Sequence, residues 1–386
     1  MHYFDHNATT PLDPRVLEAY VDALQGFPGN ASSVHQVGQR ARGALEDARE
    51  RLARILDCEA EEVIFVSGGT EADNLALLGA VRATRKPRKH VITSAIEHPA
   101  VLNACRRLEE EGVAVTYLPP DGQGQIDPDA VRRALRPETV LISIMHANNE
   151  TGVLQPVAEI GEIAQAAEIA FHSDGVQAFG KIPVDLRALH ADFYSLSAHK
   201  LYGPKGIGAL VARKSAPLAP ILYGGSQERR RRPGTENVPA AVAMAVAAEL
   251  AVAEMPSETV RLAQLRDRLE RAVLEKIPAT GVNGAGAPRL PNTTNIYFDG
   301  VKADALIIAL DLRGFAVSSG SACSSGKLEP SHVLMAMGLS LERARASIRI
   351  SLGRWTTPEQ VDALVEALVD SVEQLRRLAP AELSHV

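Results

Sequence analysis

Lys200 and Asp174 are the residues whose surroundings first suggest chemistry. Lys200 lies in YSLSAHKLYGPKG, directly before a glycine-rich turn, and Asp174 ends the mostly apolar run EIAFHSD. A lysine in this position is either a solvated surface amine or a partly buried Schiff-base lysine whose pKa lies below its usual value of about 10.4. An unpaired carboxylate at the end of an apolar strand is unfavourable, so Asp174 must cap a helix, join a salt bridge or bind a cation.

A bound pyridinium ring would satisfy both residues. Pyridoxal phosphate (PLP) forms a Schiff base with a lysine. A carboxylate beside its ring nitrogen keeps that nitrogen protonated, so that the ring acts as an electron sink. We therefore interpret Lys200 as the residue that binds PLP and Asp174 as the partner of the ring nitrogen.

The segment SGGTEADN, residues 67–74, is a candidate phosphate site. Two glycines, Gly69 among them, let the backbone approach a ligand closely, Thr70 adds a hydroxyl, and a helix N-terminus follows. Ser197 and His199, which flank the lysine, are further candidate phosphate donors.

The elements that must position these residues form an α/β pattern. Short apolar runs alternate with amphipathic stretches from about residue 60 to 215, which indicates a mostly parallel sheet covered by helices on both faces. Ligands of open α/β sheets bind at the carboxyl ends of the strands, so polar residues after five of the strands are expected around one cleft. His98 is one of them, and it either stacks on the ring or caps the next helix. The expected strands are EVIFV, HVITSA, VAVTYL, TVLISIMH, EIAFHSD, DFYSLSA and GIGALVA.

A second, smaller unit follows a long helical pattern at about 237–276. The strand TTNIYF, a helix, the strand FAVSS, a cysteine-containing loop, the strand SIRISLG and a final helix from Pro358 indicate an α+β unit. We predict a large PLP-binding domain over residues 15–255. Residues 1–14 and 256–386 would form a small domain that carries the cysteine loop at about 318–330.

Composition and charge exclude several classes of function. The net charge of −6 does not favour nucleic-acid binding, and the run of four arginines at 229–232 is most simply a solvated loop. The cysteines Cys58, Cys105 and Cys323 are widely spaced, and neither a disulfide framework nor a metal-ligand pattern is evident. An RNA-binding protein that uses the arginine run is therefore disfavoured.

The sequence also predicts a cytoplasmic protein with no membrane association. MHYFDHNATTPLD has no apolar core of the signal-peptide type. VPAAVAMAVAAELAVAEM is rich in alanine and interrupted by two glutamates, so a buried helix explains it better than a membrane span.

Eight ordered motifs resemble those of the cysteine desulfurases, which belong to the class V aminotransferase group of fold-type I PLP enzymes. The resemblance runs from YFDHNATTP to about residue 357, and the long SGSAC loop is similar to the nitrogen-fixation and iron–sulfur-cluster branch. The motifs are SGGTEADNLAL, EHPAV, MHANNETGVLQP, HSDGVQAFGK, SLSAHKLYGPKGIG, RRPGTENV, SSGSACSSGKLEPSHVLMAMG and SIRISLGRWTT.

The resemblance implies further roles for individual residues. Gln177 would donate to the phenolic oxygen of PLP, Asn149 would lie near that oxygen and the substrate, and Arg349 would clamp the substrate carboxylate. Thr235 would reach the phosphate of the partner subunit in a homodimer, with Arg232 beside it helping to hold an anion.

Other implied roles concern residues already singled out from their surroundings. His98 would stack on the ring and act as acid or base, while Thr70, Ser197 and His199 would bind the phosphate. Ser226 stands where the family usually has a third glycine, which alters the loop on that side.

Cys323 lies among glycines and serines, an unusual setting for a core cysteine. As a hypothesis, it is the nucleophile that takes sulfur from L-cysteine, leaving L-alanine and a persulfide on the enzyme. A thiol on a glycine-rich loop could serve both the cleft and an external acceptor. The resemblance implies that an iron–sulfur scaffold or another sulfur-acceptor protein is that partner.

Two alternatives remain open from the sequence. A selenocysteine lyase or another class V PLP enzyme would share the cofactor site, and an aminotransferase would not need Cys323. A non-catalytic thiol carrier would use the sheet only as a support, and its Lys200 would bind no PLP.

Overall fold

The large unit of the protein is built on one seven-stranded sheet. The computed structural model describes residues 1–319 and 330–378. The strand order is β2-β8-β7-β6-β5-β3-β4; β8 runs antiparallel to both neighbours, and the other pairs are parallel. This confirms the predicted mostly parallel sheet. The strands are β2 (Val63–Val66), β3 (His90–Ser94), β4 (Ala114–Leu118), β5 (Thr139–Ser143), β6 (Ala170–Asp174), β7 (Phe193–Ser197) and β8 (Gly208–Ala212).

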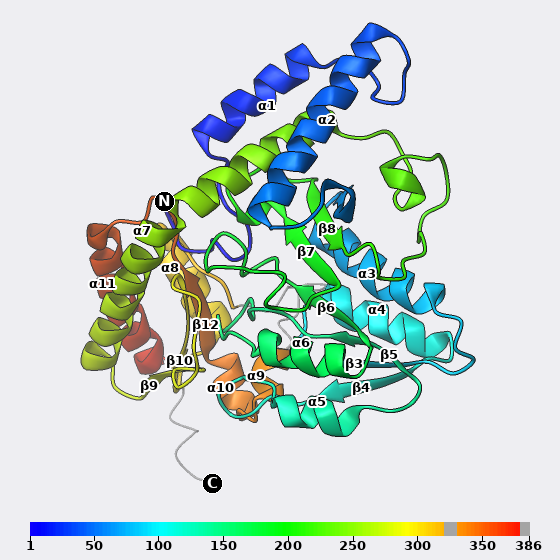
Figure 1. Cartoon of the computed structure of the whole chain (residues 1–386). Helices are drawn as coiled ribbons and strands as arrows, with labels where there is room; N and C mark the ends of the chain where they lie inside the picture. Colours follow the sequence, from blue (N-terminus) through cyan, green and yellow to red (C-terminus); the bar gives the residue numbers. More distant parts are fainter. Residues whose placement is uncertain (320–329, 379–386) are drawn as a thin grey trace.

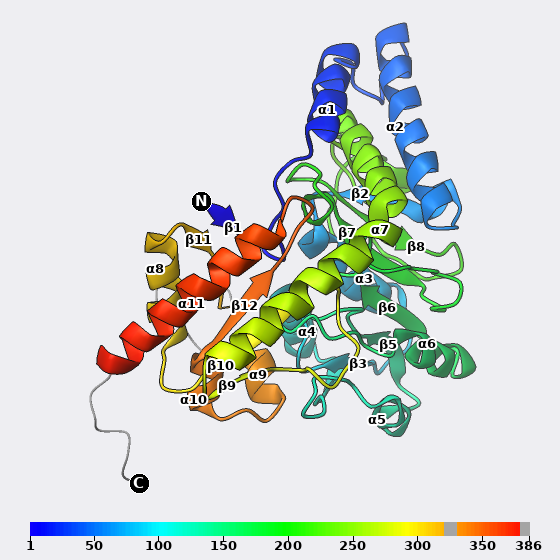
Figure 2. The same cartoon turned by 90° about the vertical axis from the view of Figure 1, so that its left-hand side faces the viewer.

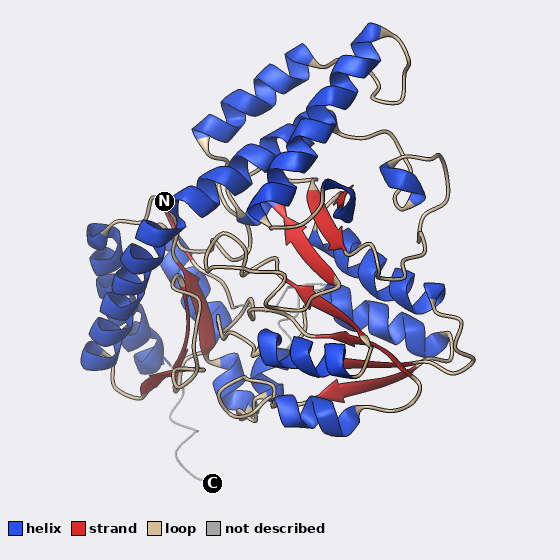
Figure 3. Cartoon of the chain, in the orientation of Figure 1, coloured by secondary structure: helices blue, strands red, loops and turns tan. Residues whose placement is uncertain are grey.

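Helices cover both faces of this sheet (Figure 3). On one face, α3 (Gly69–Ala83) and α4 (Pro99–Glu110) bury aliphatic side chains against the strands. The core on the other face takes residues from the remaining helices of the large unit and from the first half of α7. These helices are α1 (Pro14–Gly26), α2 (Gln36–Ile55), α5 (Pro128–Ala134) and α6 (Val157–Ala166).

Helix α7 (Val238–Lys276) joins this unit to the smaller one (Figure 1). Its alanine-rich first half packs against α1 and α2, and beyond Pro256 it lies beside α11 (Pro358–Leu378) (Figure 2). Within the described residues, α7 is long and apolar enough to cross a membrane by length and composition alone, but 50% of its most apolar window is buried inside the protein. This burial agrees with the predicted core helix.

The smaller unit has its own hydrophobic core. Phe4 from the N-terminal segment packs in this core with residues between Leu262 and Val372. The elements are a β12-β10-β9 antiparallel sheet, a parallel β1-β11 pair and four helices among the described residues: β1 (His2–Tyr3), β9 (Thr280–Val282), β10 (Thr293–Phe298), β11 (Phe315–Ala316), β12 (Ser347–Ser351), α8 (Ala303–Leu312), α9 (His332–Ala336), α10 (Leu341–Arg345) and α11. The predicted division of the chain stays a prediction, since Phe4 packs in the core of the smaller unit whereas residues of α9 and α10 pack in the core of the large unit.

Most strands are slightly shorter than the sequence predicts, and two of them are shorter by three residues. The strand expected over 139–146 ends at Ser143, although His146 N still donates to Asp174 O across 2.9 Å. FAVSS forms strand only at Phe315–Ala316, because the β1 partner of these residues is itself two residues long, and Ser318 makes a single antiparallel bridge with Arg349.

Candidate active site

A cavity of about 230 Å³ opens at the carboxyl ends of the parallel strands. This location follows the rule for ligand sites in open α/β sheets. Most of the predicted site residues line it, whereas Thr235 and Arg349 do not. The lining residues are Ala8, Gly69, Thr70, Asp73, His98, Met145, Asn149, Asp174, Val176, Gln177, Ser197, His199 and Lys200.

Lys200 enters the cavity from the short 3₁₀ turn that follows β7. Its Nζ donates to the backbone oxygens of Asn7 and Ala8, the latter over 2.7 Å. Burial, helped by the positive charge of Arg349, lowers the pKa of Lys200 to about 8. A lowered pKa is the property that a Schiff-base lysine needs, because only the neutral amine is nucleophilic.

Asp174 is the last residue of β6 and is 7% exposed. Its Oδ1 accepts the backbone N–H of Val176 over 2.9 Å, and no lysine or arginine of residues 1–319 and 330–378 forms an ion pair with it. Burial raises the pKa of this carboxyl to about 6, and the neighbouring Asp73 adds to the effect. A buried carboxylate with this environment fits a protonated ring nitrogen as its missing cation.

The glycine turn before α3 forms the second end of the cavity. A Cβ on Gly69 would lie 2.8 Å from Val176 Cγ2, so only glycine allows this close approach. The first turn of α3 points N–H groups outward, and Ser197 Oγ is buried without a hydrogen-bond partner. An orphaned hydroxyl beside a helix N-terminus fits a phosphate.

His98 combines the two roles that the sequence left open. It caps α4, because its Nδ1 accepts the N–H of Ala100 over 3.1 Å, and it also lines the cavity. The neutral ring therefore carries its proton on Nε2. Desolvation of the imidazole lowers the pKa of His98, even though the residue as a whole is exposed, so the neutral form is favoured.

Arg349 lies beside the cavity rather than in its wall. This residue of β12 donates from Nη1 to Asn149 O over 2.9 Å and from Nη2 to Asp5 Oδ1 over 2.7 Å. Its Nε is buried without a hydrogen-bond partner. A buried unpaired guanidinium donor next to the site fits a carboxylate ligand.

Three predicted residues lie outside this arrangement. Thr235 is exposed and away from the cavity of its own chain, and Cys323 falls outside the described residues. Arg232 has a partner within the chain, because its Nε donates to Glu71 Oε1 over 2.8 Å. This contact neutralises an acidic residue in the first turn of α3, and the expected role of Arg232 in holding an anion stays a prediction.

Sequence reasoning missed other residues of the site. The backbone oxygens of Asn7 and Ala8 hold Lys200, and Asp73 lines the cavity with an unpartnered Oδ1. The motif YFDHNATTP was the available signal for the first two, but a backbone carbonyl can come from any residue type. Lys181 was also missed, although it follows Gln177 by one helical turn in the motif HSDGVQAFGK.

The two described cysteines are poor nucleophiles. Burial raises the pKa of both Cys58 and Cys105 to about 12, in agreement with the structural role predicted for them. No group of three or more potential metal ligands occurs within the part of the chain that the structure describes.

Comparison with known proteins places the chain in a family. Residues 2–364 match the model of the aminotransferase class-V family. A protein named cysteine desulfurase IscS from Dictyoglomus turgidum is 47% identical over 378 residues, covering 98% of this chain and 96% of that relative. A protein of the same name from Methanosarcina thermophila is also 47% identical, covering 98% and 93%.

A solved structure of a NifS-like protein has the same fold. It superposes with a TM-score of 0.91 at 36% identity, covering 97% of this chain and 99% of that one. The chain therefore belongs to the class-V aminotransferase family, and both of these relatives carry the name cysteine desulfurase.

Proposed function

We propose that the protein is a PLP-dependent cysteine desulfurase that converts L-cysteine to L-alanine and leaves the sulfur as a persulfide on Cys323. The observation that carries the proposal is a set of three groups around one cavity: the Lys200 amine with its lowered pKa, the Asp174 carboxylate without an ion-pair partner among the described residues, and the Ser197 hydroxyl without a hydrogen-bond partner. The chain is 47% identical, over 98% of its length, to proteins named cysteine desulfurase. This similarity supports the proposal and disfavours the selenocysteine lyase, thiol-carrier and RNA-binding alternatives.

The residues of the cavity would hold PLP at three points. Lys200 would bind it covalently, Asp174 would pair with its ring nitrogen, and Gly69, Thr70, Ser197 and His199 would surround its phosphate. PLP, when bound, supplies an electron sink for the bonds at the substrate Cα. Gln177 and Asn149 line the same cavity and are the candidate donors to the ring oxygen.

Arg349 would orient the substrate, and His98 would exchange a proton with it. The unpaired Nε of Arg349 is the donor left for the carboxylate of L-cysteine. The Nε2 of His98 is the ring nitrogen left to exchange a proton with the reacting substrate, since its Nδ1 caps α4.

The sulfur transfer balances without an external redox partner. Cys323, as thiolate, would attack the substrate sulfur, so that an S–S bond forms and the Cβ–S bond breaks. The electron pair stays with carbon, a proton completes the methyl group of L-alanine, and the enzyme retains Cys–S–SH. The assignment of Cys323 rests on the sequence and on the relatives, because residue 323 lies outside the described part of the chain.

The partners are proposed on the same basis. A homodimer in which Thr235 completes the phosphate site of the other subunit would explain why this residue is exposed in the single chain. An iron–sulfur scaffold or another sulfur-acceptor protein would remove the persulfide sulfur. We place the enzyme in the cytoplasm, where a persulfide-forming thiol stays reduced.

The test combines product analysis with one cysteine variant and its control. Wild type given L-cysteine and a thiol reductant should form equal amounts of alanine and sulfide, and without the reductant Cys323 should carry labelled sulfur. Cys323→Ser should lose both products, whereas Cys58→Ser should keep them because Cys58 is a half-buried thiol with a raised pKa. Full desulfurase activity of Cys323→Ser would overturn the role of this residue, and a protein that takes up no PLP would overturn the proposal as a whole.

A further inference from the structure

Lys181 is a buried amine beside the active site to which the reaction assigns no role. Its Nζ donates to Gln177 Oε1 over 2.8 Å. Its side chain also lines a second, small cavity, and Lys200 lines both this cavity and the PLP cleft. Lys181 and Gln177 are four residues apart in the turn that follows β6, so a local contact connects this amine to the cleft.

The electrostatic surroundings of Lys181 are unfavourable for a cation. The charges that act on it are those of Lys200 and Arg349, and with desolvation they hold the pKa of Lys181 well below its usual value. The nearby histidines, His6 and His199, offer no negative charge, and both have lowered pKa values to which Lys181 contributes.

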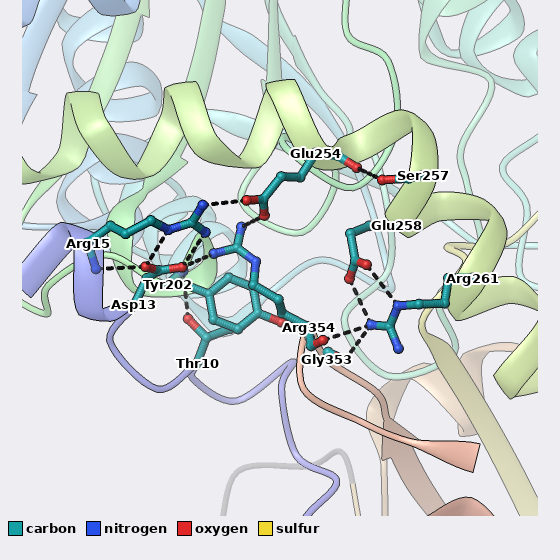
Figure 4. Close-up of polar contacts among 10 residues, drawn as sticks. All are labelled: Thr10, Asp13, Arg15, Tyr202, Glu254, Ser257, Glu258, Arg261, Gly353 and Arg354. Carbon is teal, nitrogen blue, oxygen red and sulfur yellow. Dashed lines mark hydrogen bonds and ion pairs between the residues drawn. The ribbon is translucent and has the colours of Figure 1, made fainter.

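The acidic residues that share the small cavity have other partners. Glu254 pairs with Arg15 and Arg354, and Glu258 pairs with Arg261, as Figure 4 shows. Asp5, which lies near Lys200, pairs with Arg349. No ion pair of Lys181 exists among residues 1–319 and 330–378, so the fold holds an amine at a cost in free energy.

The contact with Lys181 helps to set the orientation of the Gln177 amide, that is, on which side its Oε1 and its Nε2 lie. An amide side chain can be turned by half a rotation, which exchanges its acceptor for its donors. The amine of Lys181 donates to Oε1, while Asn7 O can only accept and takes Gln177 Nε2 over 2.9 Å, so the two contacts together favour one orientation of the amide. Asn7 O is also an acceptor for Lys200, and Lys181 is therefore the partner of Gln177 that does not compete with the catalytic lysine.

We propose that Lys181 is a positioning residue: it holds the NH₂ group of Gln177 available to the cleft, and it weakens the hold of the Lys200–PLP linkage on its proton. This inference rests on the proposed function, because it concerns the cofactor site. The sign follows from the orientation of the amide. A donor to the ring oxygen withdraws negative charge from the linkage, and the linkage then holds its proton less tightly.

The decisive measurement is a pH titration of the visible absorbance of the PLP-loaded protein. In Lys181→Met, which keeps the length of the chain and removes the amine, the pKa of the linkage should rise by about 1. The thermal midpoint of the apoprotein should not fall, because a buried unpaired amine is replaced by an apolar group. Lys181→Gln, which keeps an N–H donor at this position, should show a smaller rise.

Two controls separate positioning from packing and from charge. Lys205→Met removes an exposed lysine near His199 and should leave the linkage pKa unchanged. In a Gln177→Leu background, Lys181→Met should raise the linkage pKa by less than it does in the wild type, since the effect through the amide is already lost.

Each unfavourable result has a distinct meaning. An unchanged linkage pKa in both Lys181 variants, or a lowered apoprotein midpoint with an unchanged pKa, would overturn the inference while leaving the cofactor assignment intact. Absence of any visible band in wild type supplied with PLP would contradict the proposed function, and this inference with it.

Discussion

Two buried carboxylates, Glu228 and Asp174, have opposite environments. The Glu228 side chain is 2% exposed and accepts two 2.7 Å hydrogen bonds from Arg49, which is equally buried, and a third from Phe65 N over 3.0 Å. Asp174, also buried, accepts one backbone N–H within the chain and has no cation among the described residues.

The presence or absence of a paired cation distinguishes a structural carboxylate from one that can bind a ligand. A buried ion pair with every oxygen satisfied completes a fold, whereas a buried carboxylate without a cation leaves a place for one. The backbone around Glu228 supports the structural reading. Glu228, Arg229 and Arg230 all have positive φ values of 44°, 55° and 66°, and strained non-glycine residues persist only where surrounding contacts hold them.

The largest expected effect comes from breaking the satisfied pair. Glu228→Gln would leave the Arg49 guanidinium buried without its counter-ion, and the free energy of unfolding should fall by about 3–5 kcal/mol, measured by urea denaturation of the apoprotein. Glu46→Gln is the matched control. Glu46 bonds the same arginine over 3.2 Å but is 37% exposed, so its loss should cost less than about 1 kcal/mol. An equal loss in the free energy of unfolding for the two variants would mean that the buried Glu228 contributes no more to stability than the exposed Glu46.

The same chemical change at the unsatisfied carboxylate should act on catalysis instead. Asp174→Asn should lower the turnover of L-cysteine by about 10²–10³-fold, because a preorganised charge opposite the ring nitrogen is lost. The apoprotein should be no less stable than wild type, since the variant removes a buried charge that has no partner. A stability loss comparable with that of Glu228→Gln would show that Asp174 is structural.

The sequence could predict the unsatisfied site better than the satisfied one. Three of the site residues lie at or just after the end of a short apolar strand: Asp174 ends β6, Lys200 follows β7 and His98 follows β3. A parallel sheet gathers such positions at one edge. Arg49 and Glu228 are 179 residues apart, and no local pattern joins them. The run at 229–232 is predicted to be a solvated loop, but Arg232 is partly buried and pairs with Glu71, which is 161 residues away in the sequence.

Two features of the site could not be predicted from residue types: its backbone contacts and the burial of one lysine. Asn7 and Ala8 hold Lys200 through carbonyl oxygens, which any residue would supply, so their types carry no signal. Lys181 was hidden for a related reason, because a lysine is usually exposed and only the packing around Gln177 reveals its buried amine.

Two buried hydroxyls extend the comparison to neutral groups. Ser197 Oγ and Ser173 Oγ both lack hydrogen-bond partners and both lie on central strands, but only Ser197 lines the cavity. Ser197→Ala should weaken PLP binding by about 10–100-fold, the worth of one hydrogen bond to a charged group. Ser173→Ala should leave the affinity unchanged in the same absorbance titration. A similar loss in both variants would mean that strand packing, rather than the hydroxyl, is being measured.

The smallest effect concerns Lys200 itself and is seen by changing pH rather than sequence. Because burial and Arg349 lower the pKa of Lys200 to about 8, the neutral amine predominates only above that pH. The rate at which the apoprotein forms the visible band with PLP should therefore fall about tenfold for each pH unit below 8, and it should level off above pH 8. Arg349→Gln removes a positive charge near the amine, so the midpoint should move upward. A rate that rises without levelling toward pH 10 would mean that Lys200 titrates as an ordinary surface amine, and the contrast between satisfied and unsatisfied buried groups would then not extend to the lysine.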